Sequence, residues 1–448
     1  MIPSLFALAF ASSGCAAHAG SAQQQLEAGH ARSLVKPASP QRQERDALRG
    51  PVLERADFVR AVLAANPSVE AARQGWRAAL ARVRQAGAFE DPMLDVGLAP
   101  LSLVSSKASV GYEIAISQHL PWFGKRSLEA SMAAAEAEAA RSDYDEMKRE
   151  LALSALALYD RYFVSVRSLE INATHVQLMR ALRDNATAQF GSGHGSAQDS
   201  LQAEAELTHM EHDAVTLASQ RDVLVAQMNE LLHRSAELAL PPPAAALNAP
   251  AAREQSPNRL QSEAAETRPD IRALRQRSRA EQARAERAER EYLPDFTVST
   301  SYNSMWDMPE HRWMLGLGFN LPIQRGKRAA AADEARALRA QVESEIARLT
   351  DTARTQVFVG LRKLQESQHV LVLFETRLLP VAIAQIDAAR AGFVTSQNSF
   401  SAVIEAERNL RRVELDYQMA HAEHAQRQSE LQRALGRIPG LEGEEVQP

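Results

Sequence analysis

An internal duplication limits the possible folds of this sequence more than any other feature. Several landmarks recur about 202 residues apart, each with a similar residue pattern. They are Asn66-Pro67 with Arg268-Pro269, Asp91-Pro92 with Leu293-Pro294, Leu120-Pro121 with Leu321-Pro322, and Gly124-Lys125-Arg126 with Gly326-Lys327-Arg328. Further along the chain, Glu204 and Glu206 recur as Glu405 and Glu407, 201 residues later. A constant spacing over so many landmarks predicts two copies of one structural unit.

The duplication divides the chain into segments. Residues 53–235 form the first predicted repeat and residues 258–436 the second, and a Pro- and Ala-rich stretch, 236–257, links them. Residues 16–52 and 437–448 are predicted tails. Residues 1–15 have the character of a signal peptide, because a short apolar run leads into small residues and Cys15, the pattern of a lipoprotein acylation site. We therefore expect export from the cytoplasm and a lipid on Cys15.

Composition excludes some functions. The chain has 51 Lys and Arg against 56 Asp and Glu, so no basic excess indicates nucleic-acid binding. One cysteine in 448 residues rules out a disulfide framework. After the leader, no stretch approaches the ~20 apolar residues of a transmembrane helix.

Each repeat contains the same predicted order of elements. A helix, about 67–90 or 269–292, is followed by two short segments in which apolar and small or polar residues alternate, as in a half-buried strand. The four alternating segments are Met93–Leu101, Ser109–Gln118, Phe296–Tyr302 and Trp313–Phe319. Each has one apolar face and one face made mostly of Gly, Ser, Thr and Ala.

These strands suit a membrane barrel with a water-filled lumen better than a soluble core. Aromatic residues at the strand ends are typical of the girdles at membrane surfaces, and they are Trp122, Phe123, Trp306 and Trp313. Four strands cannot close a barrel, and lipid does not tolerate an open sheet edge. We therefore expect about three copies of the chain to contribute twelve strands.

Long helices follow each strand pair. Residues from about 125 to 189 and from about 327 to 391 are rich in strong helix formers, and a helix of about 65 residues is ~100 Å long. Each ends at a Gly-containing turn, and a returning helix carries a heptad pattern, which predicts an antiparallel coiled-coil hairpin. Pro380 predicts a kink near the end of the second long helix.

The strand-to-helix motifs resemble those of the TolC family of outer-membrane efflux channels. The most specific are the segment Gln118–Arg126 and its partner Phe319–Arg328, supported by the duplicated order of elements over about 53–436. The resemblance implies a mainly α fold with a small transmembrane β part. It implies a homotrimer in which a twelve-stranded β-barrel continues into an α-helical periplasmic tunnel, located in the outer membrane of a Gram-negative bacterium and in contact with its lipid. The implied function is passive export.

The form Pro121-Trp122-Phe123-Gly124-Lys125-Arg126 looks most like the heavy-metal efflux branch. That branch implies two partners, a periplasmic membrane-fusion adaptor and an RND-type pump of the inner membrane. The cargo would be heavy-metal cations. Multidrug efflux and type I polypeptide secretion stay open, because the pump rather than the channel selects the cargo.

The resemblance also implies functional residues. Glu405 and Asp199 match positions of an acidic ring at the periplasmic gate, while Ala402 and Gln202 fill the family's second acidic position in each repeat. The hairpin tips would dock the adaptor through Gly191, Ser192, Gly193, Gly392, Phe393 and Val394. The strand-to-helix junctions would be formed by Pro121, Gly124, Lys125, Arg126, Pro322, Gly326, Lys327 and Arg328.

No catalytic constellation is present in the sequence, so we expect no enzymatic activity, no cofactor and no resident metal. The His209/His212 and His421/His424 pairs lack a clear third ligand, and the methionines at 305, 308 and 314 have ordinary loop composition. A rival hypothesis from another class is a soluble periplasmic coiled-coil adaptor or scaffold, whose strands form an ordinary β domain. It predicts extraction from cell envelopes without detergent.

Overall fold

The computed structural model describes residues 48, 50–103, 109–193, 195–247, 256–395 and 397–441. Cys15, the leader and most of both predicted tails lie outside these residues. The first run of elements is α3 (Arg55–Ala65), α4 (Pro67–Ala86), β1 (Met93–Leu98), β2 (Tyr112–Leu120), α5 (Lys125–Gly191) and α6 (Ala197–Leu231). The second is α7 (Pro257–Thr267), α8 (Pro269–Arg290), β3 (Phe296–Asn303), β4 (Trp313–Phe319), α9 (Arg325–Leu373), a π-helical turn η3 (Phe374–Leu378), α10 (Leu379–Val394) and α11 (Phe400–Ala434). Short 3-10 turns, η1 (Pro100–Leu103) and η2 (Pro309–His311), precede β2 and β4.

Each run begins with two helices where the sequence predicts one. Asn66 separates α3 from α4: its side chain accepts a hydrogen bond from the Ser68 N–H at 2.9 Å, and Pro67 occupies the first turn of α4. Arg268 and Pro269 separate α7 from α8 at the equivalent place, with Arg268 in an extended conformation and without a side-chain cap. The additional helices are short and bury few residues, among them Phe58 and Val62 in α3 and Leu260 in α7.

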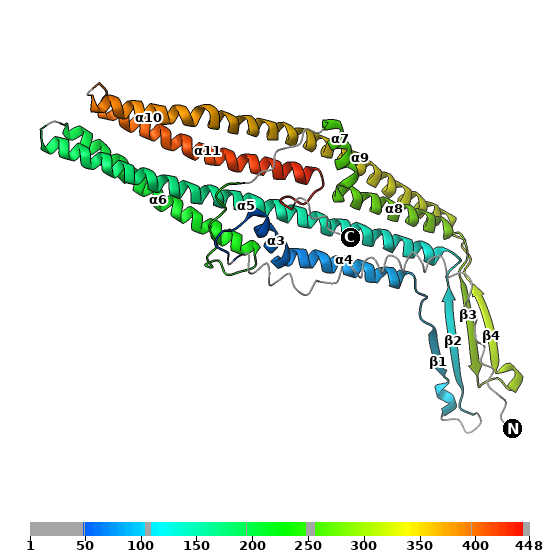
Figure 1. Cartoon of the computed structure of the whole chain (residues 1–448). Helices are drawn as coiled ribbons and strands as arrows, with labels where there is room; N and C mark the ends of the chain where they lie inside the picture. The colour runs from blue at the N-terminus through cyan, green and yellow to red at the C-terminus, as the bar shows by residue number, and fades with distance from the viewer. Residues whose placement is uncertain are drawn as a thin grey trace.

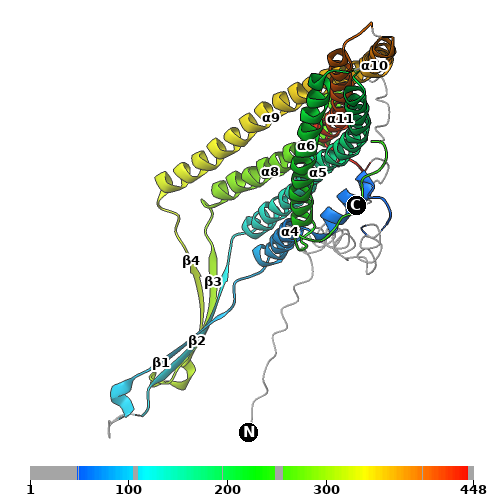
Figure 2. The same ribbon diagram turned by 90° about the vertical axis from the view of Figure 1, so that its left-hand side faces the viewer.

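The four strands form one antiparallel sheet in the order β1-β2-β3-β4. β1 and β4 are its edges, and no further strand pairs with either among the described residues. Every residue of β1 and of β4 is exposed, including Val96 at 63% and Leu317 at 69%. Figures 1 and 2 show the sheet extending away from the helical part. The prediction of a mainly α fold with four strands and long antiparallel helical hairpins is confirmed.

The long helices form two antiparallel hairpins that lie side by side, with their tips at the far end from the sheet (Figure 1). The first hairpin is α5 with α6, and the second is the continuous helix from α9 through η3 to α10, with α11. The 67 residues of α5 are about 100 Å long. One apolar core lies where α3, α5 and α11 meet, around Phe58, Leu156 and Tyr159. A second core joins the hairpins nearer the tips, around Met179, Met210 and Ile404.

The spacing between the repeats changes along the second hairpin. At the start of the long helices it is 202 residues, from Lys125 to Lys327, but the caps of the returning helices, Ser196 and Ser399, are 203 apart. The returning helices, α6 and α11, both have 35 residues. The added residue lies between these points, and the π-helical turn η3 is the structure that accommodates one extra residue within a helix.

One sequence interpretation changes as a result. Glu407 corresponds to Glu204 rather than to Glu206, so the spacing of 201 residues assigned to these glutamates is wrong. The helix continues past Pro380 to Val394, in line with the sequence prediction, and the π-helical turn η3 ends two residues before this proline. Pro380 is the second residue of α10, directly after the change from π-helical to α-helical hydrogen bonding.

The expectation that no stretch after the leader is apolar enough to span a membrane is also wrong. Among the described residues, the helix Arg325–Val394 contains an 18-residue window with mean hydropathy 1.5, of which only 17% is buried. A helix whose apolar side chains are covered by another protein chain meets the same criteria of length and composition as a membrane-spanning helix. The second hairpin therefore presents uncovered apolar side chains in a single copy.

Candidate functional site

The junction between β2 and α5 is built around a buried lysine. Lys125 is 3% exposed, and its Nζ lies 2.9 Å from Asp295 Oδ1 and donates a hydrogen bond to the Leu293 carbonyl at 3.1 Å. The Trp122 N–H donates to the same carboxylate at 2.7 Å. Although burial opposes its ionisation, the hydrogen bonds from Trp122 and Lys125 hold the pKa of Asp295 below its usual value. The motif residues thus fasten the first repeat to the start of β3.

The backbone conformation at Gly124 explains why the first junction motif contains a glycine. Its φ of 88° is in the left-handed region, and a Cβ at this position would overlap the Arg290 guanidinium. Pro121 lies just before this turn and Arg126 just after it, where the guanidinium stacks 3.4 Å from the centre of the Phe89 ring.

The second junction has the same motif in a different environment. Gly326 is already inside α9, and a Cβ there would meet nothing within 4 Å. Lys327 is exposed, whereas Arg328 donates a hydrogen bond to the Glu291 carbonyl at 2.6 Å. Pro322 lies in the irregular segment before the helix. The first junction is therefore enclosed within the chain, while the second is at the edge of the chain.

The hairpin tips are mostly exposed. The first tip ends α5 with Gly193 in the left-handed region, at φ 76°, and Gly191 and Ser192 are exposed beside it. In the second tip, the Gly392 carbonyl accepts from the Gln397 N–H at 2.7 Å. Val394 is 82% exposed, but the Phe393 ring packs on Phe400, with 5.5 Å between ring centres. Phe393 thus contributes to the tip's own packing.

The two residues assigned to the gate lie on the returning helices near the tips. Asp199 is in the first turn of α6 and is half-buried, and Glu405 is exposed in the second turn of α11. Glu405 lines a groove of about 670 Å³ between α6 and α11, and Asp199 is not part of its lining. The structure therefore places both carboxylates at the same end of the molecule but not in one pocket.

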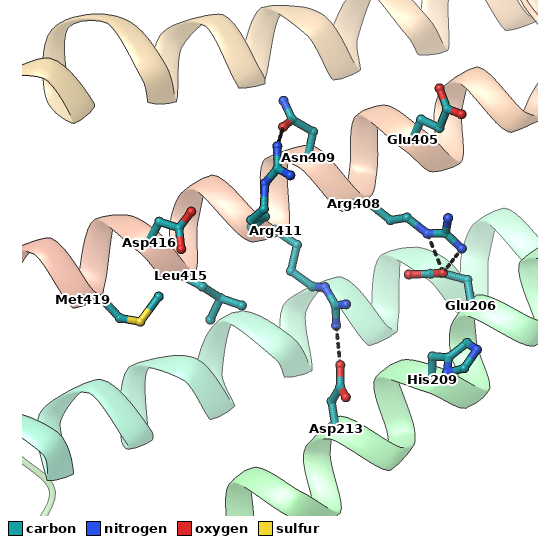
Figure 3. A pocket seen from close by; sticks show the side chains of 11 residues that line it. Glu206, His209, Asp213, Glu405, Arg408, Asn409, Arg411, Leu415, Asp416 and Met419 are labelled. Atoms are coloured by element: carbon teal, nitrogen blue, oxygen red, sulfur yellow. Dashed lines mark hydrogen bonds and ion pairs between the residues drawn. The ribbon is translucent and has the colours of Figure 1, made fainter.

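Ion pairs that the sequence did not reveal connect the helices across this groove. Arg408 Nε lies 2.7 Å from Glu206, and Arg411 lies 3.1 Å from Asp213 (Figure 3). Each pair joins α11 of the second hairpin to α6 of the first. The acids are seven residues apart on α6 and the arginines three apart on α11, and only the tertiary structure brings these two patterns together.

A buried cluster behind the groove joins the hairpins more tightly. His175 of α5 is 3% exposed, with Nδ1 2.5 Å from Glu407 and Nε2 2.8 Å from Glu414, both on α11. Glu407 is fully buried and also lies 3.3 Å from Arg390 of α10. Two carboxylate partners require both ring nitrogens to carry protons. Burial lowers the pKa of His175, but the hydrogen bonds to Glu407 and Glu414 outweigh burial and raise the pKa to about 9.

Comparison with known proteins supports the fold assignment. No protein-family model and no curated protein matches the chain. Among solved structures, the outer-membrane channel OprN is similar, with a TM-score of 0.71, 19% identity, and coverage of 85% of this chain and 89% of that one. The outer-membrane protein VceC of Vibrio cholerae gives 0.70, 16%, 85% and 95%. CusC, described as forming a transmembrane channel, gives 0.72, 17%, 90% and 96%. At these identities the similarity establishes the fold, and the chain has the TolC-like fold of these outer-membrane channels.

Proposed function

We propose that the protein is the outer-membrane channel of a tripartite efflux system, a passive conduit from the periplasm to the exterior with no catalytic role. One observation carries the proposal: the sheet extends from the helical part with its apolar side chains exposed, in a chain whose fold resembles outer-membrane channels over most of its length. An apolar sheet face of this kind is stable in lipid, where its side chains need no protein cover.

The open edges of the sheet support assembly from several copies. β1 and β4 have no further strand partner in the described ranges, and unpaired N–H and C=O groups are not tolerated in hydrocarbon. In the proposed homotrimer, β4 of one copy pairs with β1 of the next, and three copies close a barrel of twelve strands. The hairpins of the three copies then form the wall of a tunnel in the periplasm.

The remaining roles follow from the resemblance. The tips at Gly191–Gly193 and Gly392–Val394 dock a periplasmic membrane-fusion adaptor, and an RND-type inner-membrane pump supplies the energy. Glu405 and Asp199, repeated around the symmetry axis, form the gate and favour cations. Cys15, outside the described residues, carries a lipid that anchors the chain to the outer membrane.

Heavy-metal cations are the proposed cargo. The support is the Pro-Trp-Phe-Gly-Lys-Arg form of the first junction, from Pro121 to Arg126. The similar structures do not separate the heavy-metal branch from the other branches of these channels, because CusC, OprN and VceC have nearly equal TM-scores with this chain. Organic-drug efflux and type I secretion are therefore the competing cargo classes.

Growth of a strain lacking the chain tests the cargo. The panel contains copper, silver, zinc, cobalt and cadmium salts beside dyes and detergents, with and without a plasmid copy of the chain. We expect sensitivity to metals only, reversed by the plasmid. Sensitivity to organic compounds alone would retain the channel and overturn the metal assignment.

Fractionation tests the channel against the soluble scaffold. The exposed apolar residues of β1 and β4 predict that the protein stays in the outer-membrane fraction until detergent is added. Release by salt or by alkaline buffer alone would instead support the scaffold.

A further inference from the structure

Because the two repeats correspond residue by residue, a contact seen between the repeats within one chain predicts an equivalent contact between neighbouring copies. Within the chain, α5 packs against α11, so the first hairpin touches the second along one face. By the spacing of 202 residues before η3 and 203 after it, α5 corresponds to the helix α9–α10, and α11 corresponds to α6. A contact equivalent to α5 on α11 therefore joins α9–α10 of one chain to α6 of another.

Residues buried at the contact within the chain have exposed counterparts. Ile404 of α11 is fully buried in the core that joins the hairpins, whereas its counterpart Leu201 on α6 is 70% exposed. Leu156 of α5 is fully buried in the core that α3, α5 and α11 share, whereas its counterpart Phe358 on α9 is 45% exposed. Both uncovered faces thus carry apolar side chains at the positions that are covered in the other repeat. The helix Arg325–Val394, which carries one of these faces, also contains the mostly uncovered apolar window.

The polar centre of the contact has counterparts as well. His175 lies between Glu407 and Glu414, and the counterparts of these glutamates on α6 are Glu204 and Glu211. Counted from the start of the long helices, the counterpart of His175 is Arg377, within the π-helical turn. Arginine keeps the positive charge and has enough N–H donors for two carboxylates.

Arg377 is available for such a contact. It is exposed, and it forms no ion pair with any residue in the described part of the chain. Glu204 and Glu211 are paired with Arg183 at 3.3 Å and Arg180 at 2.7 Å, but both pairs are exposed to solvent and such pairs contribute little to stability. These carboxylates can therefore accept a second cation without a large loss.

We propose that the helix α9–α10 of one copy packs on α6 of the next copy in the register that α5 adopts on α11, with Arg377 between Glu204 and Glu211. This contact is head-to-tail, so repetition closes a ring when the rotation permits it. The inference rests on the proposed channel for the number of copies in the ring. Its own content is the pair of faces, the register and the arginine contact.

Crosslinking in membranes tests the contact in the full chain. Arg377→Cys combined with Glu211→Cys, treated with a short bismaleimide, should give covalent dimers and trimers on a denaturing gel. Arg180→Cys with Glu211→Cys is the matched control, because these residues pair within one chain, and it should run as a monomer. Each single variant should also run as a monomer, which excludes crosslinks through Cys15.

Charge reversal provides a second readout. Arg377→Glu should cause loss of the oligomer under mild detergent, and adding Glu204→Arg and Glu211→Arg should restore it. Two results would overturn the register while leaving the channel proposal intact. One is an oligomer of normal size that gives no crosslink between positions 377 and 211, and the other is an Arg377→Glu oligomer as stable as the native one. A protein that is monomeric in detergent, with no crosslinks, would contradict both.

Discussion

Lys125 and Asp295 form an ion pair, with 2.9 Å between Nζ and Oδ1, that joins the start of α5 to the start of β3. The lysine is almost fully buried and the aspartate side chain is 13% exposed. The pair therefore connects the two repeats where the helical part meets the sheet.

Removing this lysine should destabilise the protein. Lys125→Met keeps the length of the side chain but leaves Asp295 without its cation, and breaking a buried pair in this way costs about 3 kcal/mol. Thermal unfolding followed by circular dichroism should show a lower midpoint. Lys327→Met is the control. Lys327 is exposed, and the residue of the first repeat that corresponds to Asp295 is the uncharged Met93, so removal of this lysine should change the midpoint little. Equal midpoints for the two variants would show that the buried pair contributes nothing.

The glycines of the two junctions should differ in the same way. Gly124→Ala places a Cβ in the left-handed region and against Arg290, at a cost of about 1–2 kcal/mol from the backbone alone. Gly326→Ala falls inside a helix with open space around it and should be neutral or stabilising by up to about 1 kcal/mol. Unfolding midpoints of the two variants measure this difference, and a Gly124→Ala protein as stable as Gly326→Ala would contradict the structure at this turn.

The His175 cluster predicts a pH dependence of stability. The pKa of His175 is about 9 in the folded protein and its ordinary value is 6.5, so the protonated ring stabilises the fold. This stabilisation is complete below about pH 6.5 and is lost as the pH rises through 9. His421 and His424 titrate below this window, because burial lowers their pKa.

Thermal midpoints between pH 6 and pH 10 measure this effect. They should fall over the upper part of the range, and the fall should disappear in His175→Gln, which has no titrating ring. His421→Gln serves as the control and should retain the fall. A curve that is the same for the native chain and for His175→Gln would exclude His175 as its source.

The proposed gate predicts a change in conduction. Glu405→Gln should lower the preference of the purified channel for cations over anions in a planar bilayer, because a charge repeated around the pore is removed. Asp199→Asn tests the other repeat in the same way. Asp222→Asn, an exposed residue paired with Arg221 far from the tips, should leave the current–voltage curve unchanged. An unchanged curve for Glu405→Gln removes this residue from the gate.

The sequence was sufficient for the large elements because their signals are long or repeated. The alternation in Trp313–Phe319 and the helix formers after Lys125 each extend over many residues, and the duplication supplies every signal twice. The added helices α3 and α7 were missed because 11 residues carry only three turns of periodicity.

The contacts between the hairpins depend on tertiary structure. His175 has an unremarkable sequence context, and its two glutamates are more than 230 residues away. The π-helical turn was missed because its one added residue has no composition of its own and shows only as a change in spacing between Lys327 and Ser399. Pro380, which does have a recognisable signal, lies two residues after the turn.

The pairing of β2 with β3 has a consequence for folding. Leu120 lies opposite Phe296 in the register, and the whole first hairpin lies between them in the chain. A contact this distant in sequence forms slowly, because a long loop must be closed before the pairing compensates for the lost chain entropy. During synthesis, β1 and β2 therefore wait as an isolated apolar hairpin while some 170 residues follow. On the proposed route to the outer membrane, this apolar hairpin is therefore the segment that stays exposed until β3 and β4 arrive.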